Sequence, residues 1–305
     1  MRAIVGFGLG AMLAVSGAAQ AADRPAISGI SHIAVYASDA VAAQQFYETK
    51  LGAEKQPDPE DPRGVRYRFS PQQFVEVLPL PAGHGISRLA HVAFSTSDAV
   101  KLRAYLVARD AQEVTPVQRA PDGGQWFSAR DPEGNLVQFV QSATAGATPA
   151  PGALSGRIIH IGFEVHDRAK EDTFYRTLLG FRPYWYGAMK PGTTDWVSQQ
   201  VPDGHDWLEY MMVGDGSTTP LTKIDGQELG VLNHFSLGVP NMEAAVTTLI
   251  AGDRLSPRHD GPQMGLDGKW QANLYDPDGT RVELMEFQPV TKPCCSAFTA
   301  DSPAR

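Results

Sequence analysis

The stretch "NLYDPDGTRVELMEF" (273–287) decides the fold, because the earlier stretch "SARDPEGNLVQFVQ" (128–141) repeats its pattern. Each stretch places an Asp-Pro-acid-Gly turn before a short strand with alternating apolar residues. When the two turns are aligned, Glu283 falls where Gln138 stands. Side chains alternate along a strand, so both residues point to the same face of their sheets. The chain therefore repeats a turn and a strand but exchanges a carboxylate for an amide.

Three more pairs of segments repeat along the chain. They are "ISHIAVYASD" (30–39) with "IIHIGFEVHD" (158–167), "QFYETKLG" (45–52) with "TFYRTLLG" (173–180), and "LAHVAFSTSD" (89–98) with "LNHFSLGVPN" (232–241). Each unit opens with a strand that carries a histidine and continues with an amphipathic helix. Three short strands complete it. Such self-similarity predicts several copies of one supersecondary unit.

Four histidines mark the starts of four units: His32, His91, His160 and His234. We predict an α+β fold of four βαβββ modules, paired into two domains with curved mixed sheets. The expected domains are 28–141 and 157–288. The segment 142–156 between them is rich in small residues and proline and has the composition of a linker. A polar tail, 289–305, follows.

The composition is that of a globular protein of about two domains. The chain has 305 residues, 42% hydrophobic and 20% charged, with a net charge of −8. An acidic chain without basic clusters is not suited to nucleic-acid binding. No segment is apolar over enough residues to span a bilayer. We therefore expect a small-molecule partner rather than a nucleic acid or a membrane.

The N-terminus has the order of a secretory signal. Arg2 precedes an apolar stretch over residues 4–15, and Ala19-Gln20-Ala21 supplies the small residues of a cleavage site. We therefore interpret residues 1–21 as a signal peptide and expect a periplasmic or secreted protein.

The only two cysteines, Cys294 and Cys295, are adjacent. Neighbouring cysteines bridge only with unusual geometry. We interpret them as part of an inert tail, while binding of a soft metal or pairing between chains stays open. The chain has no disulfide framework.

The first-strand histidine, the "FY…LG" helix and the "DP-x-G-x-x-x-E" strand together resemble the vicinal oxygen chelate superfamily. This superfamily includes glyoxalases, methylmalonyl-CoA epimerases, extradiol dioxygenases and drug-sequestering resistance proteins. The resemblance extends over residues 28–288. It implies paired modules around a metal centre, but it does not select one reaction, because a fold does not define a function.

The second half offers two imidazoles and two carboxylates at matched positions: His160, Glu209, His234 and Glu283. Each glutamate follows its histidine by 49 residues (209 − 160 and 283 − 234). Two buried carboxylates without a cation would repel each other. The four residues therefore predict a mixed nitrogen and oxygen site for a divalent metal such as Zn, Ni, Mn, Co or Fe(II). The resemblance implies a metal at the same positions.

The first half offers His32, Glu76, His91 and Gln138. An amide oxygen can still bind a cation, but it carries no charge and cannot accept a proton. We therefore expect a degenerate site in the first half, while a weaker second metal site stays open.

The resemblance leaves three functions open. The first is a glyoxalase-like lyase or isomerase, in which the metal polarises a carbonyl and Glu209 or Glu283 removes a neighbouring proton. His205, four residues before Glu209, is a further acid–base candidate. The substrate would be a small oxygenated compound such as a keto-sugar or hydroxy-ketone. An insertion over 187–196 would cover the site.

The alternative is a non-haem Fe(II) extradiol dioxygenase, with His160, His234 and Glu283 as its two-His-one-carboxylate triad. Two features count against it. Asn273 stands where the extradiol signature has tyrosine, and Glu209 would take a position that oxygen or catechol needs. A binding protein that sequesters a drug or metabolite is the third interpretation, and the complete set of four metal-binding residues disfavours it.

The N-terminal sequence predicts cleavage after Ala21. Removal of Arg2 leaves 25 basic residues against 34 acidic ones, so the mature chain would carry a net charge of −9. N-terminal sequencing of the exported protein should begin at Ala22. Cytosolic protein that still begins at Met1 would contradict this prediction.

Overall fold

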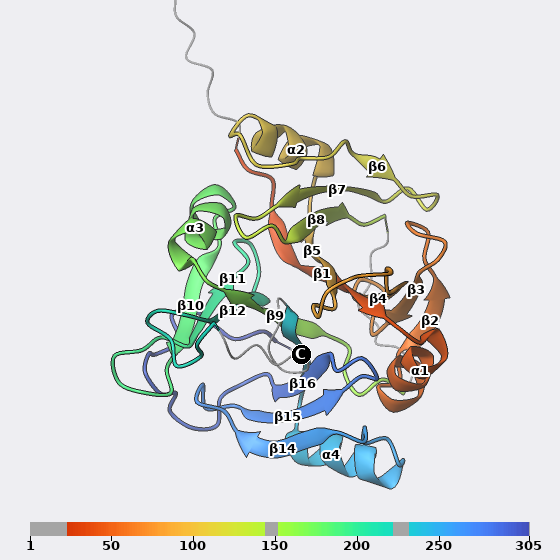
Figure 1. The fold of residues 1–305 in the computed structure, drawn as a ribbon, viewed down its shortest axis with the longest axis vertical. Helices are drawn as coiled ribbons and strands as arrows, with labels where there is room; N and C mark the ends of the chain where they lie inside the picture. Colours follow the sequence, from red (N-terminus) through yellow and green to blue (C-terminus); the bar gives the residue numbers. More distant parts are fainter. Residues whose placement is uncertain (1–22, 144–151, 222–231, 305) are drawn as a thin grey trace, which may run out of the picture.

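Each half of the chain forms one eight-stranded mixed sheet. The computed structural model describes residues 23–143, 152–221 and 232–304 (Figure 1). The first sheet has the strand order β2-β3-β4-β1-β5-β8-β7-β6, and the second repeats it as β10-β11-β12-β9-β13-β16-β15-β14. The predicted α+β class, with four βαβββ modules paired into two sheets, is confirmed.

The elements follow the predicted module order. The first sheet contains β1 (Ile27–Ala37), β2 (Glu54–Pro57), β3 (Val65–Arg68), β4 (Phe74–Pro79), β5 (Leu89–Thr96), β6 (Gln118–Arg119), β7 (Gln125–Arg130) and β8 (Leu136–Gln141). The second contains β9 (Ile158–Val165), β10 (Arg182–Gly187), β11 (Trp196–Gln200), β12 (Trp207–Met212), β13 (Leu232–Val239), β14 (His259–Met264), β15 (Trp270–Tyr275) and β16 (Arg281–Glu286). The helices are α1 (Ala40–Gln44), which continues into the π-helix η1 (Gln45–Lys50), α2 (Ala99–Val107), α3 (Arg168–Asp172), which continues into the π-helix η2 (Thr173–Leu178), and α4 (Met242–Ala251).

The strands that carry the histidines lie in the middle of each sheet. In the first sheet, β1 pairs with β5 antiparallel and with β4 parallel, and β5 pairs with β8 parallel. In the second, β9, β13, β12 and β16 have the same relations. Each sheet therefore brings two first strands and two last strands side by side.

Helix boundaries follow from local sequence. Asp39 precedes α1, and its carboxylate accepts hydrogen bonds from the backbone N–H groups of Val41 and Ala42. The first helices of the two halves are followed by Gly52 and Gly180, whose φ angles are 76° and 81°. These left-handed conformations favour glycine, so the Leu-Gly pairs of the two repeated motifs end both helices.

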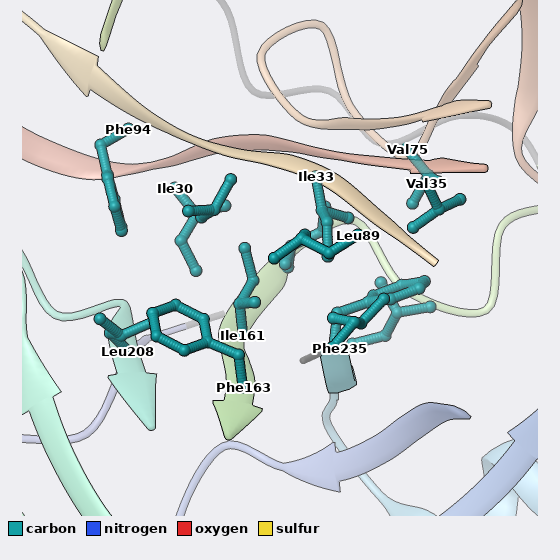
Figure 2. Packing of buried hydrophobic residues seen from close by; sticks show 14 of the residues in the cluster. Ile30, Ile33, Val35, Val75, Leu89, Phe94, Ile161, Phe163, Leu208 and Phe235 are labelled. Atoms are coloured by element: carbon teal, nitrogen blue, oxygen red, sulfur yellow. The ribbon is translucent and has the colours of Figure 1, made fainter. Parts of the chain in front are cut away.

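One continuous hydrophobic core lies between the two sheets. Figure 2 shows Ile33 and Leu89 of the first sheet facing Ile161, Phe163 and Phe235 of the second. All five side chains are at most 9% exposed. The halves have separate sheets, but they exclude water from a common apolar interior, which makes their association favourable.

Hydrogen bonds join the repeated motifs across this interior. The Tyr47 hydroxyl in the first helix of the first half donates to Asp276 Oδ2 in the last turn of the second half, at 2.9 Å. The Tyr175 hydroxyl donates in the same way to Asp131 Oδ2, at 3.1 Å. All four side chains are at most 5% exposed. The tyrosine of each "FY…LG" motif therefore binds the aspartate of the "DP-x-G" turn in the opposite half.

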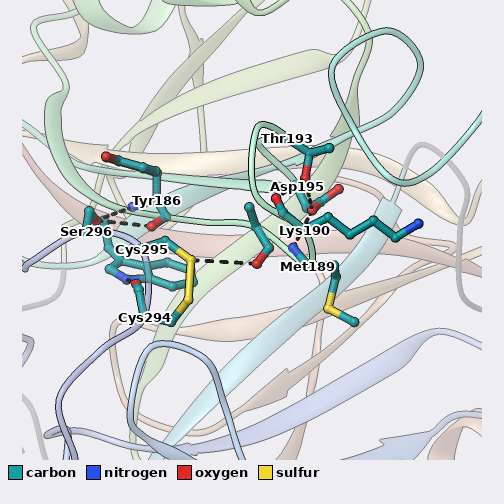
Figure 3. The surroundings of a disulfide bond; sticks show 10 residues. Tyr186, Met189, Lys190, Thr193, Asp195, Cys294, Cys295 and Ser296 are labelled. Carbon is teal, nitrogen blue, oxygen red and sulfur yellow. Dashed lines mark hydrogen bonds between the residues drawn. A yellow bond between two sulfur atoms is a disulfide. The ribbon is translucent and has the colours of Figure 1, made fainter.

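The C-terminal segment packs on the second half, so its interpretation as an inert polar tail is wrong. Cys294 and Cys295 form a disulfide with each other, and Cys295 Sγ lies 3.6 Å from the Ala188 carbonyl oxygen (Figure 3). The Trp185 indole N–H donates to the Cys294 carbonyl at 3.2 Å. Phe298 packs on Tyr184, with ring centroids 4.8 Å apart. Through these contacts the C-terminal segment packs against β10 and the residues that follow it.

Some predictions fall on parts of the chain that the structure does not describe. The signal peptide lies within residues 1–22, and most of the linker lies within 144–151, both outside the described residues. Among the helices that the structure describes, none is both long and apolar enough to cross a bilayer.

The cross-half hydrogen bonds predict a specific loss of stability. Tyr47→Phe and Tyr175→Phe would each leave a buried carboxylate oxygen without its donor, and should lower the free energy of unfolding by roughly 1–3 kcal/mol. Urea denaturation measures the change. Tyr186→Phe is the matched control, because Tyr186 is 49% exposed, and a surface substitution changes stability by about 0.5 kcal/mol or less. Equal stability of all three variants would contradict the role of these bonds.

Candidate metal centre

Two imidazoles meet inside the second sheet. His160 lies on β9 and His234 on the adjacent strand β13, and both are at most 2% exposed. Their Nε2 atoms are 2.7 Å apart. The His160 ring stacks on Trp207 with a centroid distance of 4.4 Å, which holds its orientation. The two nitrogen donors predicted from the sequence therefore point at the same place.

Two carboxylates complete the group. Glu283 Oε2 lies 3.2 Å from His160 Nε2 and 4.0 Å from His234 Nε2. Glu209 Oε2 lies 3.6 Å from His234 Nε2 and 4.0 Å from His160 Nε2. The sheet register causes this convergence. Glu209 pairs with Gly162 and Glu283 with Ser236, each two residues beyond a histidine on the neighbouring strand.

The donor set fits the divalent metal that the sequence predicts. One ligand atom each from His160, His234 and Glu283 lies within 4.8 Å of the other two. Glu283 Oε2 is buried and has no well-oriented hydrogen-bond donor among the described residues. Glu209 stands beside this triad, and its Oε1 accepts a hydrogen bond from the Ser198 hydroxyl at 3.0 Å. A two-His-one-carboxylate triad is typical of ferrous iron, and the fourth oxygen donor also suits other divalent ions.

The protonation of the histidines favours metal binding. Burial lowers the pKa of His160 below its ordinary value. Burial, Arg281 and His160 hold the pKa of His234 well below its ordinary value. Both rings are therefore neutral near pH 7. Arg281 Nη2 lies 2.8 Å and the Asn233 side-chain oxygen 2.9 Å from His234 Nδ1, and these contacts hold the orientation of the ring, with its Nε2 toward His160.

The two carboxylates differ in acidity. Burial and the charge of Glu283 raise the pKa of Glu209 to about 7. Burial also raises the pKa of Glu283, but His160 and Arg281 outweigh it, and the net pKa lies below the ordinary value. Such a separation is typical of sites in which one carboxylate binds a charge and the other moves a proton.

A cavity of about 540 Å³ opens on this group. His234, Glu209 and Glu283 line it, and its walls combine aromatic and apolar side chains with polar ones such as Asn233, Gln271 and Arg281. The wall residues include Tyr184, Trp185, Trp196, Trp207, Met264 and Phe298. Its size and lining suit a small, flat organic molecule.

The loop over 187–196 lies at the cavity, but most of the predicted insertion is elsewhere. Glu76 and Glu209 hold equivalent register positions, and the span from Glu209 to His234 is ten residues longer than that from Glu76 to His91 (25 against 15). The larger part of the insertion therefore lies in the connection from β12 to β13.

Met189, Asp195 and Trp196 contribute to the cavity wall. Asp195 joins the loop over 187–196 to the connection after β12, because its carboxylate accepts hydrogen bonds from the backbone N–H groups of Met189 and Thr218, both at 2.6 Å (Figure 3 shows the bond from Met189). The loop therefore has a fixed shape at the mouth of the cavity.

The structure does not support His205 as an acid–base group. His205 is exposed on the turn before β12, outside the cavity, and its Nδ1 lies 3.2 Å from the Asp301 carbonyl oxygen. The four-residue spacing from Glu209 does not bring it inward, because the chain turns between the two residues.

Lys269 is a charged residue at the site that the sequence did not reveal. It is fully buried, and its Nζ lies 4.6 Å from the centre of the Trp207 ring and 3.3 Å from the Tyr184 hydroxyl oxygen. Burial lowers its pKa to about 8, although Asp267 and Glu283 oppose the shift. Its aromatic neighbours come from distant parts of the chain, so no local motif marks it.

The first half also brings two imidazoles and one carboxylate together, but its carboxylate, Glu76, holds the register position of Glu209 and not that of Glu283. His32 Nε2 and His91 Nε2 are 2.9 Å apart, and Glu76 Oε2 lies 3.3 Å from His91 and 3.8 Å from His32. Gln138 pairs with Ala93, two residues beyond His91, so it occupies the register position of Glu283. The alignment of the amide with the carboxylate is therefore correct.

Comparisons with known proteins agree with this architecture. Residues 29–139 match the family model described as Glyoxalase/Bleomycin resistance protein/Dioxygenase superfamily. No curated protein matches the chain significantly. Among solved structures, the 2,3-dioxygenase LapB from Pseudomonas sp. KL28 is 16% identical, with a TM-score of 0.64 over 89% of this chain and 97% of that one. Homoprotocatechuate 2,3-dioxygenase from Arthrobacter globiformis is 16% identical, with a TM-score of 0.65 over 91% and 83%. At these identities the likeness shows the fold.

Glu283→Gln tests the metal centre directly. The change keeps the shape of the side chain but removes one anionic ligand, so metal affinity should fall on the order of 10–100-fold, the size of even indirect ligand effects. Zinc titration of the metal-stripped protein measures it. Glu243→Gln, on the exposed face of α4, is the matched control. Unchanged affinity in Glu283→Gln would exclude Glu283 as a ligand.

The buried lysine predicts a pH dependence. The folded pKa of Lys269 is about 8, below the ordinary 10.5, so between these values the unfolded chain binds the extra proton. Stability from this group therefore rises with pH. Relative to Lys269→Met, the wild type should gain about 1–2 kcal/mol of unfolding free energy between pH 7.5 and 9.5. Urea titrations at both pH values measure it. Lys101→Met, an exposed control, should follow the wild type, and parallel curves for Lys269→Met would refute the prediction.

Proposed function

We propose that the chain is an Fe(II)-dependent extradiol ring-cleaving dioxygenase. Residues 29–139 match the model of the glyoxalase/bleomycin resistance protein/dioxygenase superfamily, and residues 157–288 repeat their fold. The observation that carries the proposal is the triad of His160, His234 and Glu283, of which His234 and Glu283 line the cavity. This triad is the ligand set of non-haem Fe(II) oxygenases, which leaves positions for two substrate oxygens and dioxygen.

The neighbouring solved structures support the dioxygenase over the lyase or isomerase expected first. They include a catechol 2,3-dioxygenase that is 16% identical, with a TM-score of 0.63 over 89% of this chain and 96% of that one. A ferrous ion held by the triad would supply the redox chemistry with dioxygen and a charge that attracts two adjacent hydroxyl groups of a substrate. The protein residues would orient the ring and move its protons.

The cavity residues fit a catecholic ring. Trp207 lies against His160, and Trp185 and Trp196 stack with a centroid distance of 6.5 Å, so flat apolar surfaces face the metal site. Glu209 Oε2 lies on the open side of the triad, 3.6 Å from His234 Nε2. We assign Glu209 as the group that accepts a proton from a substrate hydroxyl, in the place of the exposed His205.

A second candidate is metal-assisted proton transfer next to a carbonyl, in a lyase or isomerase. The specific observation that favours it is the position of Glu209, which is close enough to the triad to serve as a fourth ligand. Asn273, buried on β15, also stands where the extradiol signature has tyrosine. In this function Glu209 would bind the ion in the resting protein and leave it to act as the base.

Anaerobically prepared, Fe(II)-loaded protein tests the two functions. With catechol and alkyl-substituted catechols, a dioxygenase consumes one O₂ for each ring opened, which an oxygen electrode and the absorbance of the ring-cleavage product both record. Glu283→Gln should lose at least 10-fold of this rate through metal loss, and Glu243→Gln should keep it. No oxygen uptake with Fe(II), together with deuterium exchange from solvent into a hydroxy-ketone by the Zn- or Ni-loaded protein, would refute the dioxygenase and establish the second candidate.

A further inference from the structure

The two cysteines lie where the C-terminal segment passes between the two edges of the second sheet. β10 and β14 are the opposite edge strands of this sheet. The Cys294 carbonyl accepts the indole N–H of Trp185, on β10, at 3.2 Å. The Cys294 backbone N–H donates to the carbonyl of Leu266, in the turn that follows β14, at 2.7 Å. Trp185 and Leu266 both line the cavity, so Cys294 joins two sides of it.

The residues that follow Cys295 run along β10. Ser296 Oγ accepts the Tyr186 backbone N–H at 2.9 Å and donates to the Tyr186 carbonyl at 3.1 Å (Figure 3). Phe298 packs on Tyr184, with ring centroids 4.8 Å apart, and lines the cavity. The direction in which the chain leaves Cys295 therefore decides where this part of the cavity wall lies.

The backbone of Cys295 has a conformation that a cysteine rarely adopts. Its φ angle is 71°, in the left-handed region that disfavours residues with a Cβ atom. The disulfide closes a small ring that contains the peptide bond between the two cysteines, and this ring restricts the backbone torsions on both sides of that bond. Without the ring, Cys295 can return to an ordinary conformation, and the chain after it changes direction.

This disulfide cannot act by crosslinking distant segments. The stabilisation that a disulfide gives grows with the length of chain that it closes, and here the sequence separation is 1. The bond therefore fixes only the local conformation of the segment. Both cysteines are exposed, so a thiolate from solution can attack their sulfur atoms.

We propose that Cys294 and Cys295 form a reversible thiol–disulfide site that controls access to the cavity. In the oxidised chain, the ring holds the segment against Trp185 on one side and Leu266 on the other. Reduction releases Cys295 and loosens the wall that Phe298 forms. Access to the cavity is controlled in this way for either candidate function, so the site goes beyond the proposed reaction.

A dithiol is the reductant that this chemistry requires. Its thiolate attacks one sulfur of the Cys294–Cys295 bond, which breaks the bond and forms a mixed disulfide with the reductant. The second thiol of the reductant then displaces the remaining cysteine sulfur. Two electrons and two protons pass to the chain, which is left with two thiols, while the reductant becomes a disulfide. A disulfide oxidant reverses each step.

Hydrogen–deuterium exchange of the full chain tests the site without reference to any activity. Dithiothreitol should convert both cysteines of the folded protein to thiols, which iodoacetamide labelling and mass spectrometry count. The backbone amides of Cys294 and Tyr186 should then exchange on the order of 10-fold faster or more, because the segment that holds them opens locally. The Thr280 amide, which is bonded within its own turn, is the internal control and should not change.

The double substitution Cys294→Ser and Cys295→Ser is the matched variant, because the chain contains no other cysteine. Its amides should exchange fast with or without dithiothreitol. Acrylamide quenching of tryptophan fluorescence measures access to the cavity, which Trp185, Trp196 and Trp207 line. Quenching should increase when the wild type is reduced, and it should be high in the variant under both conditions.

Two results would overturn the proposal. One is a disulfide that dithiothreitol does not reduce in the folded protein. The other is complete reduction that changes neither the exchange of the Cys294 and Tyr186 amides nor the quenching. If the double variant fails to fold, the oxidised and reduced wild type still decide between these outcomes, since the two cysteines are the only groups of the chain that dithiothreitol reduces.

Discussion

The two buried tyrosine–aspartate hydrogen bonds are the interaction on which the assembly of the halves depends. In each "DP-x-G" turn, one carboxylate oxygen accepts backbone N–H groups of its own turn, as Asp276 Oδ1 does from Thr280 at 2.8 Å. The other oxygen accepts the tyrosine of the opposite half, from Tyr47 in this case. The acidic residue of the turn adds a second link, since Asp278 accepts from the Ser38 backbone N–H at 2.8 Å. The aspartate therefore stabilises its own turn and also binds the opposite half. These two roles account for the repetition of the turn sequence in both halves.

These contacts place the first helix of each half, and the turn that it meets, at the boundary between the halves. The two ligand clusters share their first contacts. His32 stacks on Phe74 and His160 on Trp207, both with centroid distances of 4.4 Å. Their surroundings differ in charge and in space. Arg66 lies 4.3 Å above the Phe74 ring and fills the first half, while the second half has an open cavity in which a substrate can reach the ligands.

The two halves share one fold but differ in what surrounds their histidines. In the first half, Arg66 and its ion pairs with Asp58 and Glu60 fill the space beside them. Where that space is lined by aromatic rings, with Glu209 beside the ligands, an ion can also bind and activate a small molecule. The fold by itself does not make this distinction, because it is the same in both halves.

The sequence alone determined the four modules, the pairing into two sheets and the positions of the histidines and glutamates, because strand periodicity and repeated turns are local properties. The equivalence of Gln138 and Glu283 also followed from the alignment of the turns. Only the tertiary structure decided which neighbours each ligand has. His205 is close to Glu209 in sequence, but the turn directs it to solvent, whereas Lys269 and the C-terminal segment reach the site from far along the chain. Burial, charge pairing and open space depend on such distant contacts, and these decide which of the two clusters a small molecule can reach.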